Sequence, residues 1–145
     1  MVIPVGAQAL LTDLCYGASP LKEVTLNPVV HFEISVPDPE LAVTFYSTVF
    51  SWTIRKLSDP VRYWQVRASE EEGAIPGGIV GSKTGVPRVA VTIQVQSVRA
   101  TCDKIKEHGG SIVTQPQVVE GYGTHVLCKD PQGVFFAILE PPSRE

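Results

Sequence analysis

Apolar and polar side chains alternate along residues 29–36, as they do in a strand with one buried face. The apolar positions are Val30, Phe32, Ile34 and Val36. The polar positions between them are His31, Glu33 and Ser35, which therefore point to the opposite side. This segment predicts the first strand of the ordered part of the chain.

A helical pattern follows this strand. Asp38 suits a helix cap, and Pro39 suits the first helical position. Within residues 40–50, apolar side chains at helical spacing predict the packed face of the helix: Leu41, Phe45, Tyr46 and Val49. Three more strands are expected at residues 51–56, 62–68 and 75–80, and residues 83–87 read as a linker.

The same order then recurs. An alternating strand is expected at residues 88–96, a helix at 98–108 that ends at Gly109-Gly110, and strands at 111–114, 125–129 and 134–140. Sliding one half of the chain on the other places His31 on Ala90 and Val36 on Val95. A repeat of this length indicates a duplicated unit, and each unit needs the other to cover its sheet. We therefore expect two tandem βαβββ modules, at about residues 28–82 and 88–142, with eight strands that wall one cavity.

Residues 1–27 do not follow this pattern and are treated as an N-terminal extension. They contain two prolines and two glycines without a sustained period. The extension is expected either to pack as a short helix over residues 7–14 or to stay mobile.

Composition narrows the range of partners. The net charge is −3, from 12 basic and 15 acidic side chains, and no basic run is present, so no nucleic-acid partner is expected. Three cysteines (Cys15, Cys102 and Cys128) cannot all pair within one chain, which favours a reducing compartment. No apolar run is long enough to span a bilayer, and no basic side chain precedes Lys22, so neither a membrane partner nor an export signal is expected. These features predict a cytoplasmic protein of one compact domain.

Several separated motifs resemble the vicinal oxygen chelate superfamily, which includes glyoxalase I, bleomycin-resistance proteins and extradiol dioxygenases. The first module is similar at Val30–Asp38, Phe45-Tyr46, Phe50–Trp52 and Pro76–Gly78. The second is similar at Gly109-Gly110, Asp130–Gly133 and Phe135–Glu140. The resemblance implies an α+β fold in which two βαβββ modules form an open mixed-sheet barrel around one cavity. It does not specify the reaction, because this fold hosts many activities.

The resemblance also implies where a metal would bind, on the first and last strands of each module. His31 and Glu140 are suitable ligand types, whereas Ala90 is not, and residues 78–82 offer no carboxylate or imidazole. We therefore expect no firmly bound cofactor, and at most a divalent metal held weakly by His31 and Glu140 and lost on dialysis.

His31 and Glu140 are also the leading candidates for an acid–base pair, because histidine titrates near neutrality and a carboxylate can orient it. The alternative is that both are structural. Glu33 shares a strand face with His31 and is a candidate base with a raised pKa, or an exposed charge at the barrel mouth. His125 follows Gly121–Thr124, which suits either a lid containing Tyr122 or an ordinary strand connection.

The remaining candidates would line the cavity and bind substrate: Trp64, Tyr63, Phe136, Ile138, Thr92, Gln94 and Tyr122. Trp52 is expected in the core, and Cys128 is expected to be a buried thiol rather than a nucleophile.

Together these features favour an enzyme for isomerase, lyase or cyclisation chemistry on a small carbonyl or phenolic compound, by an acid–base mechanism with or without metal assistance. The alternative is a protein of the bleomycin-resistance type that binds or sequesters a small molecule without turnover. Sheet edges and apolar helix faces of such modules further predict a homodimer.

Overall fold

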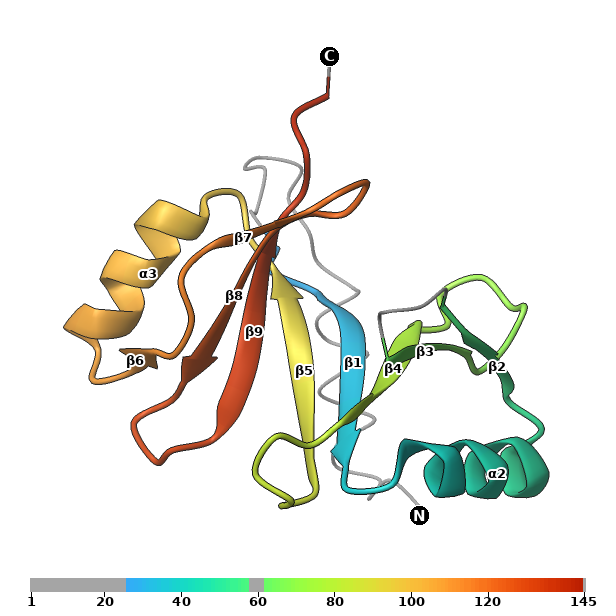
Figure 1. Ribbon diagram of the computed structural model, residues 1–145. Helices are drawn as coiled ribbons and strands as arrows, with labels where there is room; N and C mark the ends of the chain where they lie inside the picture. The colour runs from blue at the N-terminus through green and yellow to red at the C-terminus, as the bar shows by residue number, and fades with distance from the viewer. Residues whose placement is uncertain (1–25, 58–61, 145) are drawn as a thin grey trace, which may run out of the picture.

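The computed structural model describes residues 26–57 and 62–144, whose strands form one curled mixed sheet with two helices (Figure 1). The strands are β1 (Val29–Val36), β2 (Thr53–Lys56), β3 (Tyr63–Arg67), β4 (Gly77–Gly81), β5 (Arg88–Gln94), β6 (Ser111–Ile112), β7 (Gln117–Val119), β8 (Gly123–Lys129) and β9 (Phe135–Glu140). The helices are α2 (Pro39–Phe50) and α3 (Val98–Glu107). The α+β fold with repeated βαβββ order is confirmed. The short strand β7 was not predicted, and the helix expected at residues 7–14 lies outside the described residues.

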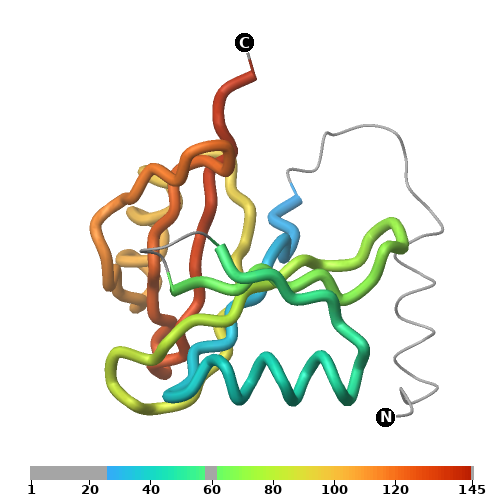
Figure 2. Tube along the Cα trace, turned by 45° about the vertical axis from the view of Figure 1, so that its right-hand side comes forward, coloured from blue at the N-terminus to red at the C-terminus, as the bar shows by residue number. Residues whose placement is uncertain are grey.

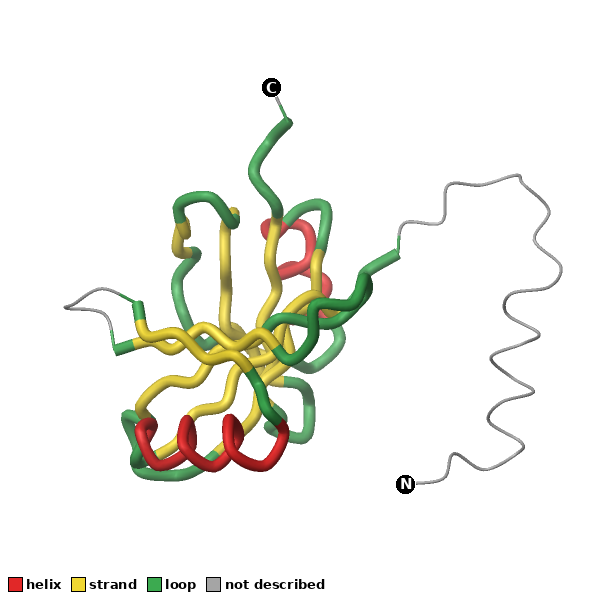
Figure 3. Tube along the Cα trace, turned by 90° about the vertical axis from the view of Figure 1, so that its right-hand side faces the viewer, coloured by secondary structure: helices red, strands yellow, loops and turns green. Residues whose placement is uncertain are grey.

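The two halves of the sheet have the same topology. The sheet order is β2-β3-β4-β1-β5-β9-β8-β6, and β7 pairs with β8. The last strand of each half runs parallel to its first, β4 beside β1 and β9 beside β5. The two first strands, β1 and β5, pair antiparallel and join the halves. In the turned views the strands β2–β4 cross the direction of β8 and β9, so the sheet is strongly curled into a half-barrel (Figures 2 and 3).

Each helix covers its own half of one sheet face. Beneath α2 the buried residues are Ile34, Trp64, Val66 and Ile79, with Trp52 stacked on Tyr46 at 5.0 Å between ring centroids. Beneath α3 they are Val95, Val98, Val126, Cys128 and Ile138. Three of the four apolar residues predicted for one face of this strand, Phe32, Ile34 and Val36, therefore pack toward α2. Trp52 packs against the same cluster, as expected.

The predicted packing face of α2 is largely wrong. Ala42, Val43 and Tyr46 pack on the sheet, whereas Leu41, Phe45 and Val49 are 68%, 53% and 56% exposed. Apolar side chains occur on most sides of this helix, so their spacing alone does not fix which side meets the sheet. Three apolar residues in one stripe, Leu41, Phe45 and Val49, are left in contact with solvent.

Candidate active site

The sheet face opposite the helices, here called the inner face, gathers the polar side chains of both modules. Strand register defines this face, because directly paired residues point to the same side. His31 pairs with Thr92, which in turn pairs with Ala137. The inner face includes His31, Glu33, Ser35, Tyr63, Gln65, Gly78, Arg88, Ala90, Thr92, Gln94, His125, Lys129, Phe135, Ala137 and Leu139.

A hydrogen bond joins His31 to Tyr63 at the centre of module 1. The Tyr63 hydroxyl lies 3.1 Å from His31 Nε2, and both side chains are partly buried. Gly78 makes this possible, because a Cβ atom at Gly78 would overlap the Tyr63 hydroxyl and ring. The β4 position that faces His31 and Glu33 thus holds no side chain, and the Tyr63 phenol fills its space.

Burial keeps both partners neutral. It lowers the pKa of His31 below its ordinary value, and the nearby His125 lowers that pKa further. Burial raises the pKa of Tyr63 well above its ordinary value, with Glu33 and Tyr122 acting in the same direction. Near neutral pH the pair is therefore an imidazole and a phenol, which can donate hydrogen bonds without carrying charge.

Glu33 lies beside this pair on the same strand face. Burial raises the pKa of its carboxyl group, and the positive charge of Arg88 opposes part of that rise. In the part of the chain that the structure describes, no hydrogen bond is made by the Glu33 side chain. A partly buried carboxylate without such a bond is a strong proton acceptor.

Module 2 contributes His125 and Tyr122 to the same face. Burial lowers the pKa of His125. A charge on His125 in turn lowers the pKa of His31, so the two rings lie close enough to interact electrostatically. Tyr122 lies in the turn between β7 and β8, and its hydroxyl accepts a hydrogen bond from Gln65 Nε2 at 3.5 Å. The turn of one module therefore reaches a strand of the other. Whether residues 121–124 act as a lid stays a prediction.

The predicted pairing of His31 with Glu140 is wrong. Strand alternation places Glu140 with Ile138, on the helix side of the sheet. The Glu140 Oε2 atom accepts a 2.7 Å hydrogen bond from the Val98 backbone N–H at the start of α3. Ser97 caps the same helix end by accepting from the Ala100 N–H. Glu140 is a helix-capping residue, and no contact joins it to His31.

Three predicted substrate-binding residues also lie on the helix side. Phe136 and Ile138 pack beneath α3, and Trp64 is 5% exposed in the core beneath α2. Adjacent strand residues point in opposite directions, so Tyr63 on the inner face requires Trp64 to face the helix. Thr92 and Gln94 lie on the inner face as expected, with Thr92 buried.

The residues present do not fit a metal centre of the kind that the resemblance implies. On the inner face of these four strands, imidazole and carboxylate groups come from β1 alone, as His31 and Glu33, whereas Gly78, Ala90 and Ala137 offer no side-chain ligand. His31 Nε2 is already bonded to Tyr63. Across residues 26–57 and 62–144, no group of three or more His, Cys, Asp or Glu side chains is placed to hold an ion. A divalent metal normally requires more protein ligands than this site offers.

Four charged, amide or aromatic residues of the inner face were missed from the sequence: Gln65, Arg88, Lys129 and Phe135. Alternation counted outward from Tyr63 would have found Gln65. Finding Arg88, Lys129 and Phe135 requires knowing which face of the second-module strands lies on the inner face. The pattern of apolar and polar residues alone does not determine this.

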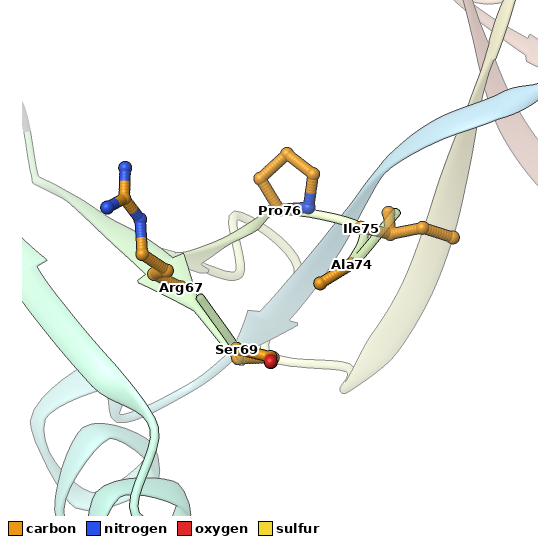
Figure 4. Close-up of a pocket in the computed structure, with 6 residues that line it drawn as sticks. Arg67, Ser69, Ala74, Ile75 and Pro76 are labelled. Carbon is orange, nitrogen blue, oxygen red and sulfur yellow. The ribbon is translucent and has the colours of Figure 1, made fainter. Parts of the chain in front are cut away.

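Two other features do not belong to this site. An open pocket of about 220 Å³ is lined by Arg67, Ala68, Ser69, Ala74, Ile75 and Pro76, at the end of β3 and the loop before β4 (Figure 4). None of His31, Glu33 and Tyr63 borders it. Cys128 is buried, and burial raises its pKa to about 11, with Cys102 acting in the same direction, as expected for an unreactive thiol.

No helix in the described ranges is long and apolar enough to cross a membrane.

A curled half-barrel of two βαβββ modules, with its polar groups gathered on the inner face, defines the class of protein. The family model of the Glyoxalase/Bleomycin resistance protein/Dioxygenase superfamily matches residues 29–138. The chain belongs to this superfamily, which confirms the resemblance described above.

Individual relatives are more distant. A probable lactoylglutathione lyase of Vibrio cholerae is 26% identical over 123 residues, covering 77% of this chain and 89% of that protein. The anthracycline biosynthesis protein DauV of a Streptomyces species is 24% identical, over 74% of this chain and 44% of that protein. The crystal structure of methylmalonyl-CoA epimerase from Mycobacterium tuberculosis matches with a TM-score of 0.62 and 15% identity, covering 85% of this chain and 94% of the epimerase. At this identity the epimerase supports the fold alone. The relative named a probable lactoylglutathione lyase agrees with the expected isomerase- or lyase-type enzyme.

Proposed function

We propose that this protein catalyses proton transfer on a small carbonyl or phenolic compound, with isomerisation, epimerisation, elimination or cyclisation as the outcome. The observation that carries the proposal is the inner-face group of Glu33, His31 and Tyr63, in which the His31–Tyr63 hydrogen bond measures 3.1 Å. Burial favours the neutral form of each of these groups. Relatives named lactoylglutathione lyase support this class of reaction and leave the substrate open.

Glu33 is assigned the role of base. Its carboxylate would remove a proton from carbon next to a carbonyl group, and the electron pair of that C–H bond would pass to the carbonyl oxygen as an enolate. The proton then returns to the same carbon in epimerisation, or to a neighbouring atom in isomerisation. In a lyase reaction the enolate expels a leaving group from the next carbon. A positioned base of this kind typically contributes a factor of about 10²–10⁴ in rate.

Tyr63 is assigned the role of donor to the developing oxyanion. When His31 carries its proton on Nε2, it donates to the Tyr63 oxygen, and the phenolic O–H is free to donate to substrate. A preorganised donor at an oxyanion is typically worth about 10²–10³ in rate. No step requires a metal, which agrees with the unsuitable ligand set on these strands.

The proposal is tested by proton exchange, which needs no knowledge of the product. The protein is incubated in D₂O with a panel of small 2-oxo acids, aldehydes and phenolic ketones, and loss of carbon-bound ¹H signals is followed by NMR. We expect catalysed exchange for at least one class of compound. Saturable binding of a compound without exchange or turnover would contradict the enzyme and favour the sequestering protein.

We also infer a homodimer in the cytoplasm. The exposed stripe of Leu41, Phe45 and Val49 on α2 supports the dimer. The odd number of cysteines, with Cys102 and Cys128 free, supports a reducing compartment, which cell fractionation would check.

A further inference from the structure

We propose that Arg88 and Lys129 form a binding subsite for the anionic group of the substrate, a carboxylate or a phosphate. The inference rests on the proposed function in one respect only, that the anion belongs to the molecule on which Glu33 acts. The subsite itself is a property of three inner-face residues, Arg88, Lys129 and Phe135.

Three strand ends bring these residues together. Arg88 begins β5, Lys129 ends β8 and Phe135 begins β9. These three strand ends lie at the same end of the sheet, at the bottom of Figure 1. Lys129 and Phe135 are directly paired, and Arg88 pairs with Ser35 of β1 on the same face. Side chains far apart in the sequence thus meet at one end of the inner face.

Phe135 holds both cations close to each other. The Arg88 guanidinium carbon lies 4.0 Å from the Phe135 ring centroid, and Lys129 Nζ lies 4.6 Å from the same point. The two positive charges are therefore no farther apart than the sum of these distances. Contact with an aromatic ring stabilises each cation, and a guanidinium that lies against a ring keeps N–H groups free to bind an anion.

Within residues 26–57 and 62–144, neither cation forms an ion pair with a carboxylate. Among the residues that the structure describes, no carboxylate oxygen lies within 4.0 Å of the Arg88 or Lys129 nitrogens. Asp130, the acidic neighbour of Lys129, instead accepts hydrogen bonds from the Gln132 and Val134 backbone N–H groups in the β8–β9 turn. Two like charges in a partly buried place repel each other, and an anion bound between them relieves that repulsion.

The subsite lies at a useful distance from the proposed base. Arg88 pairs with Ser35, which lies two residues after Glu33 on β1. The subsite and the proposed base are therefore two residues apart along this strand. That separation is about 7 Å along a strand. A compound with an anionic group a few bonds from its acidic carbon would fit both. The charge of Arg88 also reaches Glu33, since it opposes the rise in the pKa of that carboxyl group.

Binding of simple probes tests the subsite without turnover. Benzoate, inorganic phosphate and the neutral control benzamide are titrated into the full chain, and binding is followed by ¹⁵N NMR of the Arg88 side chain and neighbouring amides. We expect benzoate or phosphate to bind and benzamide not to bind at these residues. The tighter of the two anions identifies the group as carboxylate or phosphate.

Variants locate the binding. Arg88→Gln and Lys129→Gln should each weaken binding of that anion about tenfold, and Arg88→Lys should weaken it less. Lys106→Gln is the control, because Lys106 lies on α3 with Asp103 3.7 Å away. Equal binding of benzamide, or unchanged affinity in folded Arg88→Gln and Lys129→Gln proteins, overturns the subsite. Anion binding without any proton exchange would overturn the proposed function and leave the subsite standing.

Discussion

At the scale of single residues, one glycine decides the chemistry of the inner face. Gly78 leaves room for the Tyr63 phenol to cross β4 and reach His31. The sequence showed that β4 offered no metal ligand, and the structure adds that a tyrosine occupies the space of the missing side chain. The histidine is thereby placed in a hydrogen-bonded pair, and Glu33 becomes the group best suited to accept a proton.

The pKa of Glu33 yields a prediction for the pH dependence of exchange. Burial raises that pKa above its ordinary value of 4.5, and the base is active only when ionised. The exchange rate should therefore rise with pH, with a midpoint above 4.5, as measured by NMR across the pH range in which the protein stays folded. A midpoint at or below 4.5, or an identical profile for Glu33→Gln, would contradict the assignment of Glu33 as the base.

At the scale of elements, alternation and helical spacing were informative about the existence of each segment and less so about its orientation. From His31 to Val36 the first strand was predicted with both faces correct, because apolar and polar side chains alternate strictly there. A register shift between Val29 and His31 leaves Val30 outside this pattern. On β9 the period of two correctly grouped Phe136, Ile138 and Glu140. It did not show that this group faces α3, because an apolar row serves a cavity wall and a core equally well.

Helix α2 carries the prediction on assembly. Leu41, Phe45 and Val49 form an exposed apolar stripe, and solvent contact of such a stripe is unfavourable by about 25 cal/mol per Å². We expect sedimentation equilibrium to show a dimer of the 15.7 kDa chain, and Phe45→Glu to shift it to monomer while the fold is retained. Lys104→Glu, on the exposed side of α3, is the control and should stay dimeric. A 15.7 kDa species alone at high micromolar concentration would count against the dimer.

At the scale of the whole molecule, the repeat was the strongest signal in the sequence. It predicted the duplicated βαβββ order, and the motifs of the resemblance predicted the family. The site was only partly predictable, because its groups come from β1, β3 and β8 and meet only through the register and curl of the sheet. The sequence named His31, Glu33, Tyr63 and His125 as candidates, and the structure gathers them on one face. Glu140 was assigned to the wrong face.

The central claim is that catalysis depends on Glu33 of the inner face and not on Glu140. Proton exchange and thermal stability of chelator-treated protein, measured together for Glu33→Gln and Glu140→Ala, test it most directly. Glu33→Gln should lower exchange by about 10²–10⁴-fold. Because the folded protein holds the Glu33 proton more tightly than the unfolded chain, ionised Glu33 lowers stability as pH rises above 4.5, so this variant should melt no earlier than wild type at pH 7.

Glu140→Ala should show the reverse. Loss of its hydrogen bond to Val98 at the start of α3 should lower the free energy of unfolding by about 1 kcal/mol, or the melting temperature by roughly 3 °C, with exchange per folded molecule unchanged. Exchange that survives in Glu33→Gln and disappears in folded Glu140→Ala would contradict the account.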